Sequence, residues 1–175
     1  RITIASGTAT LTVAQTSPVG VGDVITYNTT SKAYVKSVVS PTQLAVQSAT
    51  GSPVADVTSA TVNSIKRAFN TLQAAEDQSD DDGYLGSSDL AGFNYKLNWV
   101  CYKDQPFTAG VTIDGYTTSS VYGITLTVAG AAQVANGASQ RHRGIAGTGA
   151  AVENASSSAS AVIDNAGDDY VTVEW

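Results

Sequence analysis

The sequence contains no methionine, one cysteine and one histidine among its 175 residues. The single thiol, Cys101, allows no disulfide within the chain, so packing and hydrogen bonds must hold the fold together. A single imidazole excludes a metal site built from several histidines. Charged residues make up only 14% of the chain, and no apolar run approaches the length of a transmembrane helix. No signal peptide and no catalytic motif stand out.

Positive charge is also scarce. The chain has nine Lys and Arg residues and fifteen Asp and Glu residues, which gives a formal net charge of −6. Binding to nucleic acid, or to an anionic membrane surface, requires a basic face. We therefore expect neither a nucleic-acid partner nor a membrane partner.

What the sequence does contain favours an all-β chain. Apolar residues reach 42%, which argues against disorder, and Gly, Ser, Thr, Ala and Val are abundant. Period-two alternation and turn residues divide residues 1–62 into short strands about ten residues apart, which is typical of a small β-barrel or sandwich. The expected strands lie near 8–13, 23–28, 32–39 and 42–48, with a further strand-like pattern at the N-terminus. We predict that residues 1–62 form a small all-β module, which also looks like a β-rich attachment or spacer module.

Residues 63–92 are expected to hold one helix, over 64–77, and a polar acidic loop. Ser64 is a plausible N-cap, and the apolar stripe of this helix is short. One face is predicted to carry Ile65, Phe69, Leu72 and Glu76. Glu76 and Asp77 would then lie in the last turn, where the helix dipole disfavours anions. Either they have a cationic partner or the helix ends earlier.

Strand patterns return in residues 93–175. Alternation places Tyr95, Leu97, Trp99 and Cys101 on one, inward face, and further strands are predicted near 111–115, 122–128, 161–165 and 170–175. Ile113-Asp114-Gly115 and Ile163-Asp164-Asn165 look like one turn repeated, as at the corner of a parallel β-helix with at most two coils. The Ala-, Gly- and Ser-rich segment 129–160 is expected to leave the coil as an excursion.

Several stretches resemble the start of right-handed parallel β-helix proteins found in phage genomes and environmental sequences. The resemblance covers roughly 64–175. It is carried by the segments 64–76, 95–102, 111–115, 139–142 and 169–175. It implies a capping helix over the N-terminal end of a β-helix, followed by its first coils, and a virion-surface or cell-surface location. It implies no activity. Because the chain ends in the apolar alternation of Tyr170–Trp175, we expect the coil to be truncated and more protein to follow.

The acidic loop raises the question of calcium binding. Aspartates cluster at 77, 80, 81, 82 and 89, and calcium prefers oxygen ligands from a flexible loop that contains glycine. Placing Gly83 at the sixth position of an EF-hand loop puts Gln78 where Asp is expected and Asp89 where a bidentate Glu is expected. The match is poor, so a solvated loop 77–89 is favoured over a calcium site.

Three other sets of residues are candidates for a binding or catalytic site. His142, between Arg141 and Arg143, fits a surface loop with local ion pairs better than an anion site. Paired carboxylates could cleave glycosides, and the candidates are Asp104, Asp114, Asp164, Asp168 and Asp169. A sugar-stacking face could use Tyr95, Trp99, Tyr102, Tyr116 and Tyr122, although core filling is favoured for them and for Cys101. We assign no catalytic, cofactor or metal-binding residue.

The sequence thus predicts a non-enzymatic structural protein: an N-terminal β module followed by a helix-capped start of a right-handed parallel β-helix. Its expected role is capsid decoration, head fibre or tail appendage, at the virion surface or outside the cell. Its expected partners are other virion or surface subunits, including further copies of itself. Two alternatives remain open. One is a tailspike that binds or degrades polysaccharide, and the other is a bacterial adhesin or filament subunit.

Overall fold

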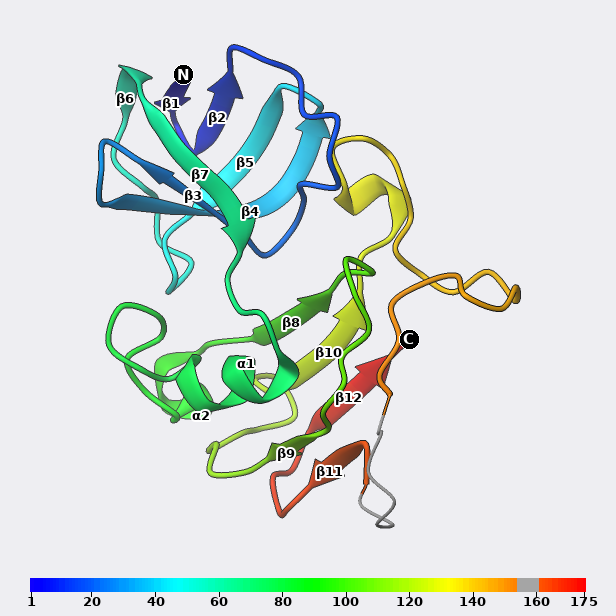
Figure 1. Ribbon diagram of the computed structural model, residues 1–175. Helices are drawn as coiled ribbons and strands as arrows, with labels where there is room; N and C mark the ends of the chain where they lie inside the picture. The colour runs from blue at the N-terminus through cyan, green and yellow to red at the C-terminus, as the bar shows by residue number, and fades with distance from the viewer. Residues whose placement is uncertain (154–160) are drawn as a thin grey trace. The chain divides into compact units, whose positions relative to one another are not determined.

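The computed structural model describes residues 1–153 and 161–175 and is mostly β (Figure 1). The chain divides into two compact units. The N-terminal unit comprises Arg1–Ala68 and Ala129–Ser139, and the C-terminal unit comprises Phe69–Val128 and Gln140–Trp175. Among the described residues, no helix is both long and apolar enough to span a bilayer.

A seven-stranded antiparallel sheet forms the N-terminal unit. Its strands are β1 (Ile2–Ala5), β2 (Thr8–Leu11), β3 (Asp23–Tyr27), β4 (Ser31–Ser40), β5 (Gln43–Gln47), β6 (Val57–Ala60) and β7 (Val62–Arg67). Their spatial order is β6-β1-β2-β5-β4-β3-β7. The two edge strands are consecutive in the chain, with Thr61 between them, and the Thr61 carbonyl accepts a hydrogen bond from the Asn28 amide at 3.0 Å. The sheet therefore curls into a half-barrel.

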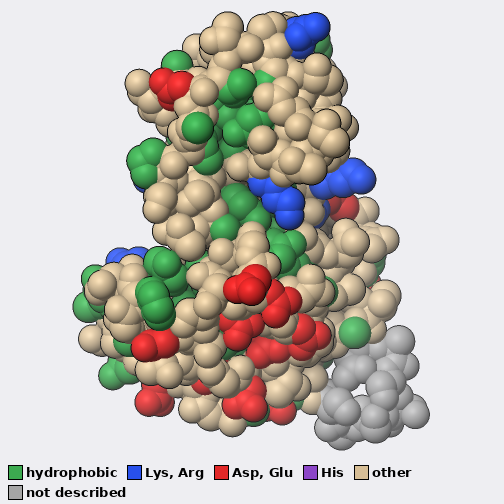
Figure 2. Space-filling model, turned by 90° about the vertical axis from the view of Figure 1, so that its left-hand side faces the viewer, with side chains coloured by type: hydrophobic (Ala, Val, Ile, Leu, Met, Phe, Trp, Pro, Cys, Tyr) green, Lys and Arg blue, Asp and Glu red, His purple; other side chains and the backbone are tan. Residues whose placement is uncertain are grey.

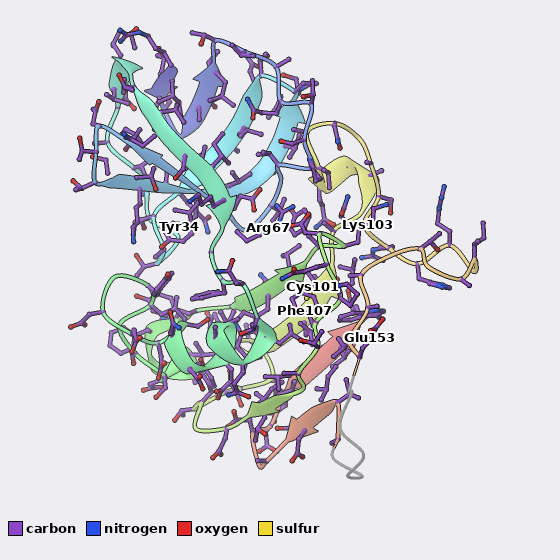
Figure 3. All side chains as sticks on the ribbon, in the orientation of Figure 1. Tyr34, Arg67, Cys101, Lys103, Phe107 and Glu153 are labelled. Carbon is purple, nitrogen blue, oxygen red and sulfur yellow. The ribbon has the colours of Figure 1, made fainter. Side chains whose placement is uncertain are left out.

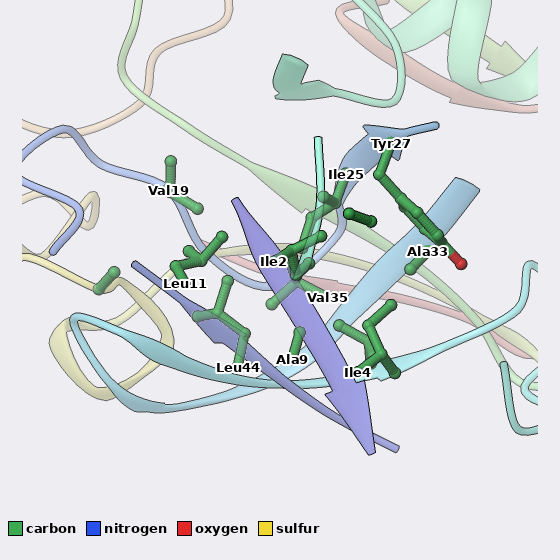
Figure 4. Close-up of a cluster of buried hydrophobic side chains, with 13 residues drawn as sticks. Ile2, Ile4, Ala9, Leu11, Val19, Ile25, Tyr27, Ala33, Val35 and Leu44 are labelled. Atoms are coloured by element: carbon green, nitrogen blue, oxygen red, sulfur yellow. The ribbon is translucent and has the colours of Figure 1, made fainter. Parts of the chain in front are cut away.

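Alternating side chains fill the inside of this half-barrel (Figure 4). Ile25 and Tyr27 of β3 are buried, as are Leu44 and Val46 of β5, which confirms the predicted inward faces. The strand predicted over 8–13 ends earlier. β2 stops at Leu11, and Val13 is 69% exposed, so the alternation continues in the sequence beyond the point where pairing ends.

The predicted helix over 64–77 is wrong in its first half. Residues 62–67 form β7, which pairs with β3 so that Ile65 lies opposite Ile25, and Ser64 is a strand residue and not an N-cap. Ile65 packs against the half-barrel core. The segment has two β-branched residues, Val62 and Ile65, and pairing with β3 supplies ladder hydrogen bonds that a short helix would not offset. Pairing with β3 therefore outweighed the weak helical pattern of apolar residues in this segment.

A buried ion pair closes the end of this strand pair. Asp23 begins β3, lies opposite Arg67 of β7 and is 1% exposed. The Arg67 Nη1 donates to both carboxylate oxygens, at 2.6 and 2.7 Å, and Nη2 donates to the Pro18 carbonyl at 3.0 Å. The Gly20 amide donates to Asp23 Oδ2 at 2.9 Å. The pair thus ties the 18–23 turn to the last residue of β7.

The segment 129–160, predicted to leave the coil as an excursion, is divided between the two units after residue 139. Residues 129–139 belong to the N-terminal unit and contain the short 3-10 helix η1 (Ala131–Gln133). Val134 forms a bridge with Gly20, and the Ala135 amide donates to the Val19 carbonyl at 2.7 Å. Residues 154–160 of the excursion, with their serine run, lie outside the described residues.

The C-terminal unit is built from parallel pairings. It contains α1 (Leu72–Gln78), α2 (Leu90–Phe93), β8 (Leu97–Cys101), β9 (Val111–Ile113), β10 (Ile124–Val128), β11 (Ile163–Asn165) and β12 (Val171–Glu174). One parallel sheet has the order β12-β10-β8, and the other pairs β11 with β9. Two isolated parallel bridges join Asp89 to Thr117 and Phe107 to Val152. Successive stretches of chain therefore lie side by side in the same direction at four places.

The register stacks inward side chains in columns. Leu97, Ile124 and Val171 form one column across the three strands, and Trp99, Leu126 and Val173 form the next. Trp99, Leu97 and Cys101 are buried, as predicted. The segments that carry Ile113 and Ile163, predicted to repeat each other, do lie side by side. The two isoleucines are not opposite each other, however, because Ile163 lies opposite Val111, two residues before Ile113. A shift of two keeps each side chain on the same face, so the sequence pattern alone does not reveal it.

Candidate functional site: the covered and the open end of the parallel stack

α1 covers the first layer of the stack. The helix spans only seven residues, and its N-cap is Thr71, whose side chain accepts from the Ala74 amide at 3.0 Å. Its buried side chains, Leu72 and Ala75, join the same core cluster as the parallel strands. Phe69 is partly buried against that cluster. Of the residues predicted to share the helix face, Leu72 thus packs in this cluster and Phe69 against it, whereas Ile65 packs against the half-barrel core.

Side chains of α1 take the place of a strand beside β9. β11 pairs with one edge of β9, and on the other edge the Thr112 amide donates to Gln73 Oε1 at 2.9 Å. The Asp114 amide donates to Glu76 Oε1 at 3.2 Å. An edge strand with unpaired amides invites pairing with another chain, and here a helix satisfies those amides. We call this side of the stack, where α1 lies beside β9 and where β8 is the edge strand of the other sheet, the covered end; no strand of the described residues pairs with the outer edge of β8.

Tyr116 connects the helix to the later strands. Its hydroxyl donates to the Glu76 carbonyl at 2.9 Å, and its amide donates to Asp168 Oδ1 at 3.0 Å. Its ring packs edge-on against Trp99, with ring centres 6.3 Å apart. The Trp99 Nε1 donates to Ser79 Oγ at 2.9 Å, and Ser79 is buried. One buried tyrosine therefore links α1, the 114–116 turn and the turn before β12.

Carboxylates surround this tyrosine. Burial raises the pKa of Glu76, and the nearby Asp77 and Asp80 raise it further. Burial also raises the pKa of Asp168, together with the charges of Asp114 and Asp169. Acidic side chains gather on the face of the molecule shown in Figure 2. Because Glu76 and Asp168 already accept backbone hydrogen bonds, their first role is to hold turns in place.

Among the described residues, no cation pairs with the carboxylates of Glu76 and Asp77. A side-chain amide donates hydrogen bonds to both of them. Gln73 Nε2 donates to Glu76 Oε2 at 2.9 Å and to Asp77 Oδ1 at 2.8 Å. Neither expected explanation is found in the described part of the chain, because α1 ends at Gln78 and its last turn holds no basic residue. The two acids are instead hydrogen-bonded by a neutral donor one turn earlier on the same helix.

The opposite side of the stack, formed by β11 and β12, is open. β12 pairs with β10 on one edge and, within residues 1–153 and 161–175, no strand pairs with its other edge. Leu97 and Trp99 at the covered end are 9% and 5% exposed, whereas Val173, in the column of Trp99, is 47% exposed. Trp175 is 41% exposed, although its Nε1 donates to the Ala150 carbonyl at 3.0 Å. The inward columns therefore end uncovered at β12, and we call this side the open end.

A second place along the open end shows the same layering. The Phe107 amide donates to the Ala151 carbonyl at 2.9 Å, and the Glu153 amide donates to the Phe107 carbonyl at 2.7 Å. The side chains of Phe107 and Glu153 are labelled in Figure 3. Phe107 is partly buried against the core of the stack. Residues 151–153 thus lie beside Phe107 as β11 lies beside β9.

Residues of the acidic loop accept hydrogen bonds from nearby backbone amides. Asp89, the proposed last ligand of a calcium loop, is the N-cap of α2, and its Oδ1 accepts from the Gly92 amide at 2.8 Å. The Asp81 carbonyl accepts from the Tyr84 and Gly86 amides. Among the described residues, no group of three or more His, Cys, Asp or Glu side chains is arranged to hold a metal ion.

The histidine segment is exposed. His142 Nδ1 accepts from the Gly144 amide at 3.0 Å, and Arg141 Nε donates to the Val128 carbonyl at 2.9 Å. Arg143 is exposed, and its amide donates to Thr148 Oγ1 at 3.3 Å. These bonds shape a local loop beside the end of β10.

The candidate catalytic carboxylates are divided. Asp168 is buried, and the charges of Asp114 and Asp169 help to raise its pKa, whereas all the other candidates, Asp104, Asp114, Asp164 and Asp169, are exposed. The candidate stacking face does not form as drawn, because Trp99, Tyr102 and Tyr116 are buried, as the core-filling interpretation predicted. Cys101 is also buried, which raises the pKa of its thiol to about 12 and keeps it in the unreactive protonated form.

A separate groove of about 540 Å³ lies on the N-terminal unit, between the β1–β2 turn, β5 and residues 51–56. Its lining includes one lysine, Lys36, and one carboxylate, Asp56. Asp56 Oδ1 accepts from the Ser6 amide at 2.9 Å. The groove does not gather the two carboxylates and the aromatic side chains that glycoside cleavage would require.

Sequence reasoning missed the residues that finish the covered end. Gln73 and Ser79 received no role, although a polar residue one turn before Glu76 on a short helix was a usable signal. Gln140, 1% exposed, was also missed, and its carbonyl accepts from the Ala150 amide at 2.8 Å. Such roles depend on distant backbone amides, which local pattern does not reveal.

No protein-family model, curated protein or solved structure matches this chain.

Proposed function

We propose that this protein is a structural component of a virion-surface or cell-surface assembly, and that its C-terminal unit is the start of a right-handed parallel β-helix. The observation that carries the proposal is the difference between the two ends of the parallel stack. One end is finished by a helix that binds free strand amides, and the other leaves apolar columns and a strand edge uncovered.

Parallel pairings at four places support the β-helix. The pairs β8–β10–β12, β9–β11, Asp89–Thr117 and Phe107–Val152 recur around one unit, as expected when a chain winds in successive layers. Each layer of a stacked protein contacts only its neighbours, so a terminal layer needs a cap that differs from the repeated ones. α1 has the properties of such a cap.

The open end has the properties of an assembly surface. Val173 lies in the column of Trp99 and Leu126, which are buried, and the exposure of Val173 and of the adjacent Trp175 leaves apolar area in water beside a strand edge. Exposed edges of this kind favour pairing with another strand. Burial and strand addition are the mechanism, and the proposed role needs no covalent chemistry. The carboxylates near Tyr116 serve the fold through backbone hydrogen bonds.

The proposal is tested by accessibility in the native assembly. Gold-labelled antibodies raised against the N-terminal half-barrel and against residues 170–175 are applied to the particles or cells that carry the protein. We expect the half-barrel epitope to be labelled in the intact assembly, and the 170–175 epitope to stay unlabelled there. Labelling of 170–175 in the intact assembly would contradict the proposal.

A polysaccharide assay separates this role from the tailspike alternative. Purified protein is incubated with host polysaccharides and the release of reducing sugar is measured, with Asp168→Asn and Asp169→Asn as variants. We expect no release. Release that both substitutions abolish would replace the structural role with a hydrolytic one.

A further inference from the structure

We infer that the groove on the N-terminal unit binds a short extended peptide segment that carries one acidic and one basic side chain. This binding site goes beyond the proposed function and does not depend on it, because all the residues that line the groove belong to the half-barrel. Two charges without ion-pair partners, unused backbone amides and an apolar part of the lining point to this ligand.

Two opposite charges line the groove without pairing. Lys36 comes from β4 and Asp56 from the segment before β6, and neither side chain forms an ion pair with any described residue. The Ser6 amide donates to Asp56 Oδ1 at 2.9 Å and so orients this carboxylate. The groove therefore offers one cation and one carboxylate to a ligand that carries charges of both signs.

A β-bulge places Lys36 at the groove. Val35 lies opposite Val46, and Ser37 lies opposite Ala45. Lys36 is therefore the extra residue of β4 and has no partner on β5. A bulge redirects a side chain, and bulges are frequent beside functional sites. The position of this cation thus follows from a local departure from the regular ladder.

Backbone amides on two sides of the groove have no acceptor. The Gly7 amide lies in the two-residue turn between β1 and β2, and the Val54 amide lies in the segment 51–56. Across residues 1–153 and 161–175 neither amide donates a hydrogen bond, whereas the Gly7 carbonyl accepts from the Val46 amide at 2.8 Å. The carbonyl oxygens of an extended peptide are suitable acceptors for such amides, as in other modes of peptide recognition.

The rest of the lining favours an aliphatic residue between the two charges. Val46 is 4% exposed, and Val54 packs against the half-barrel core, with Ala45 and Pro53 beside them in the lining. None of the lining residues is aromatic, so a sugar ring would find no aromatic face to stack on. The volume of about 540 Å³ lies within the range of sites for small ligands, so the bound segment is short.

Titration followed by nuclear magnetic resonance tests the site with two blocked peptides, acetyl-Glu-Val-Lys-amide and acetyl-Lys-Val-Glu-amide. Blocked ends leave the two side chains as the charges of each peptide. Binding is followed at the amides of Gly7, Gln47 and Val54, and the tighter peptide is compared with versions in which Gln replaces its Glu or its Lys. We expect saturable shifts at the groove. Each lost charge should raise the dissociation constant about two- to fivefold, the range that exposed ion pairs give.

Variants of the protein assign each charge of the peptide to its partner. Lys36→Gln should remove the preference for Glu over Gln and keep the preference for Lys. Asp56→Asn should do the reverse, and its side-chain oxygen can still accept from the Ser6 amide. Lys66→Gln is the matched control, because Lys66 is an exposed lysine of the same unit that does not line the groove. It should bind both charges like the unaltered protein.

Three results would overturn the inference. The first is the absence of saturable shifts with both peptides at millimolar concentration. The second is equal binding of the charged and uncharged versions, or a preference for Glu that survives Lys36→Gln. The third is saturable shifts with maltotriose and none with either peptide, which would make the groove a sugar site. None of these results bears on the antibody test of the open end, so the proposed function and this site can fail separately.

Discussion

Replacing Leu72 by alanine tests whether α1 is a cap held by packing. Leu72 is 3% exposed and shares a core cluster with Ile113 and Ile124. A seven-residue helix is too short to be stable alone, so its place depends on the side chains it buries. Buried Leu→Ala substitutions cost about 2–5 kcal/mol, and alanine adds no helix-propensity cost. We expect a loss of about 3 kcal/mol in the free energy of unfolding of the C-terminal unit.

Urea unfolding followed by tryptophan fluorescence measures this loss. Both tryptophans, Trp99 and Trp175, belong to the C-terminal unit, so the signal reports that unit. With a dependence on urea of about 1–3 kcal/mol per molar, the midpoint should fall by about 1–3 M. Gln78→Ala, at the exposed end of the same helix, is the control and should change the unfolding free energy by less than about 0.5 kcal/mol. If Leu72→Ala lowers it by less than about 1 kcal/mol, the capping argument fails.

Three further predictions concern charge. Arg67→Ala leaves the buried Asp23 carboxylate without its ion pair and should cost about 3 kcal/mol, measured as the loss of circular dichroism in urea; a loss under about 1 kcal/mol would show that the pair is dispensable. The raised pKa values of Glu76 and Asp168 mean that the folded state holds these protons more tightly than the unfolded chain. Their contribution to stability is therefore complete below the ordinary values of 4.5 and 3.8 and is lost as the pH rises through the raised values. The melting temperature of Glu76→Gln/Asp168→Asn should depend less on pH over this range than that of the unaltered protein, and equal slopes would contradict the assignment. Calcium should leave the melting temperature unchanged relative to chelator, and a rise of many degrees would reveal a cation site in the acidic loop.

Strand positions followed from local pattern. In β3, β5 and β8 the apolar residues alternate, and the same residues are buried, because a half-buried strand requires period two whatever its neighbours are. The burial of Cys101 and Trp99 followed from the same rule. Local pattern was less reliable for Ile65 and Leu72, which fit one helical stripe in the sequence but lie in a strand and a helix of different units.

Register and edge satisfaction did not follow from the sequence. Ile113 and Ile163 occur in similar turns, yet Ile163 lies opposite Val111, because a two-residue shift preserves the inward face. Gln73 and Asp168 are ordinary surface residue types. Their roles come from the amides of Thr112 and Tyr116, which are far from them in the chain.

By itself, the sequence determined that the chain is mostly β, which residues of most strands point inward, and that no disulfide holds it. These properties depend on composition and on period-two alternation, which are local. Tertiary structure alone decided where the helix begins, which strands pair in parallel, and that one end of the stack is covered while Val173 and Trp175 remain exposed at the other. Those outcomes depend on which distant backbone groups find a partner, and hydrogen-bond satisfaction across the fold is a property of the whole chain.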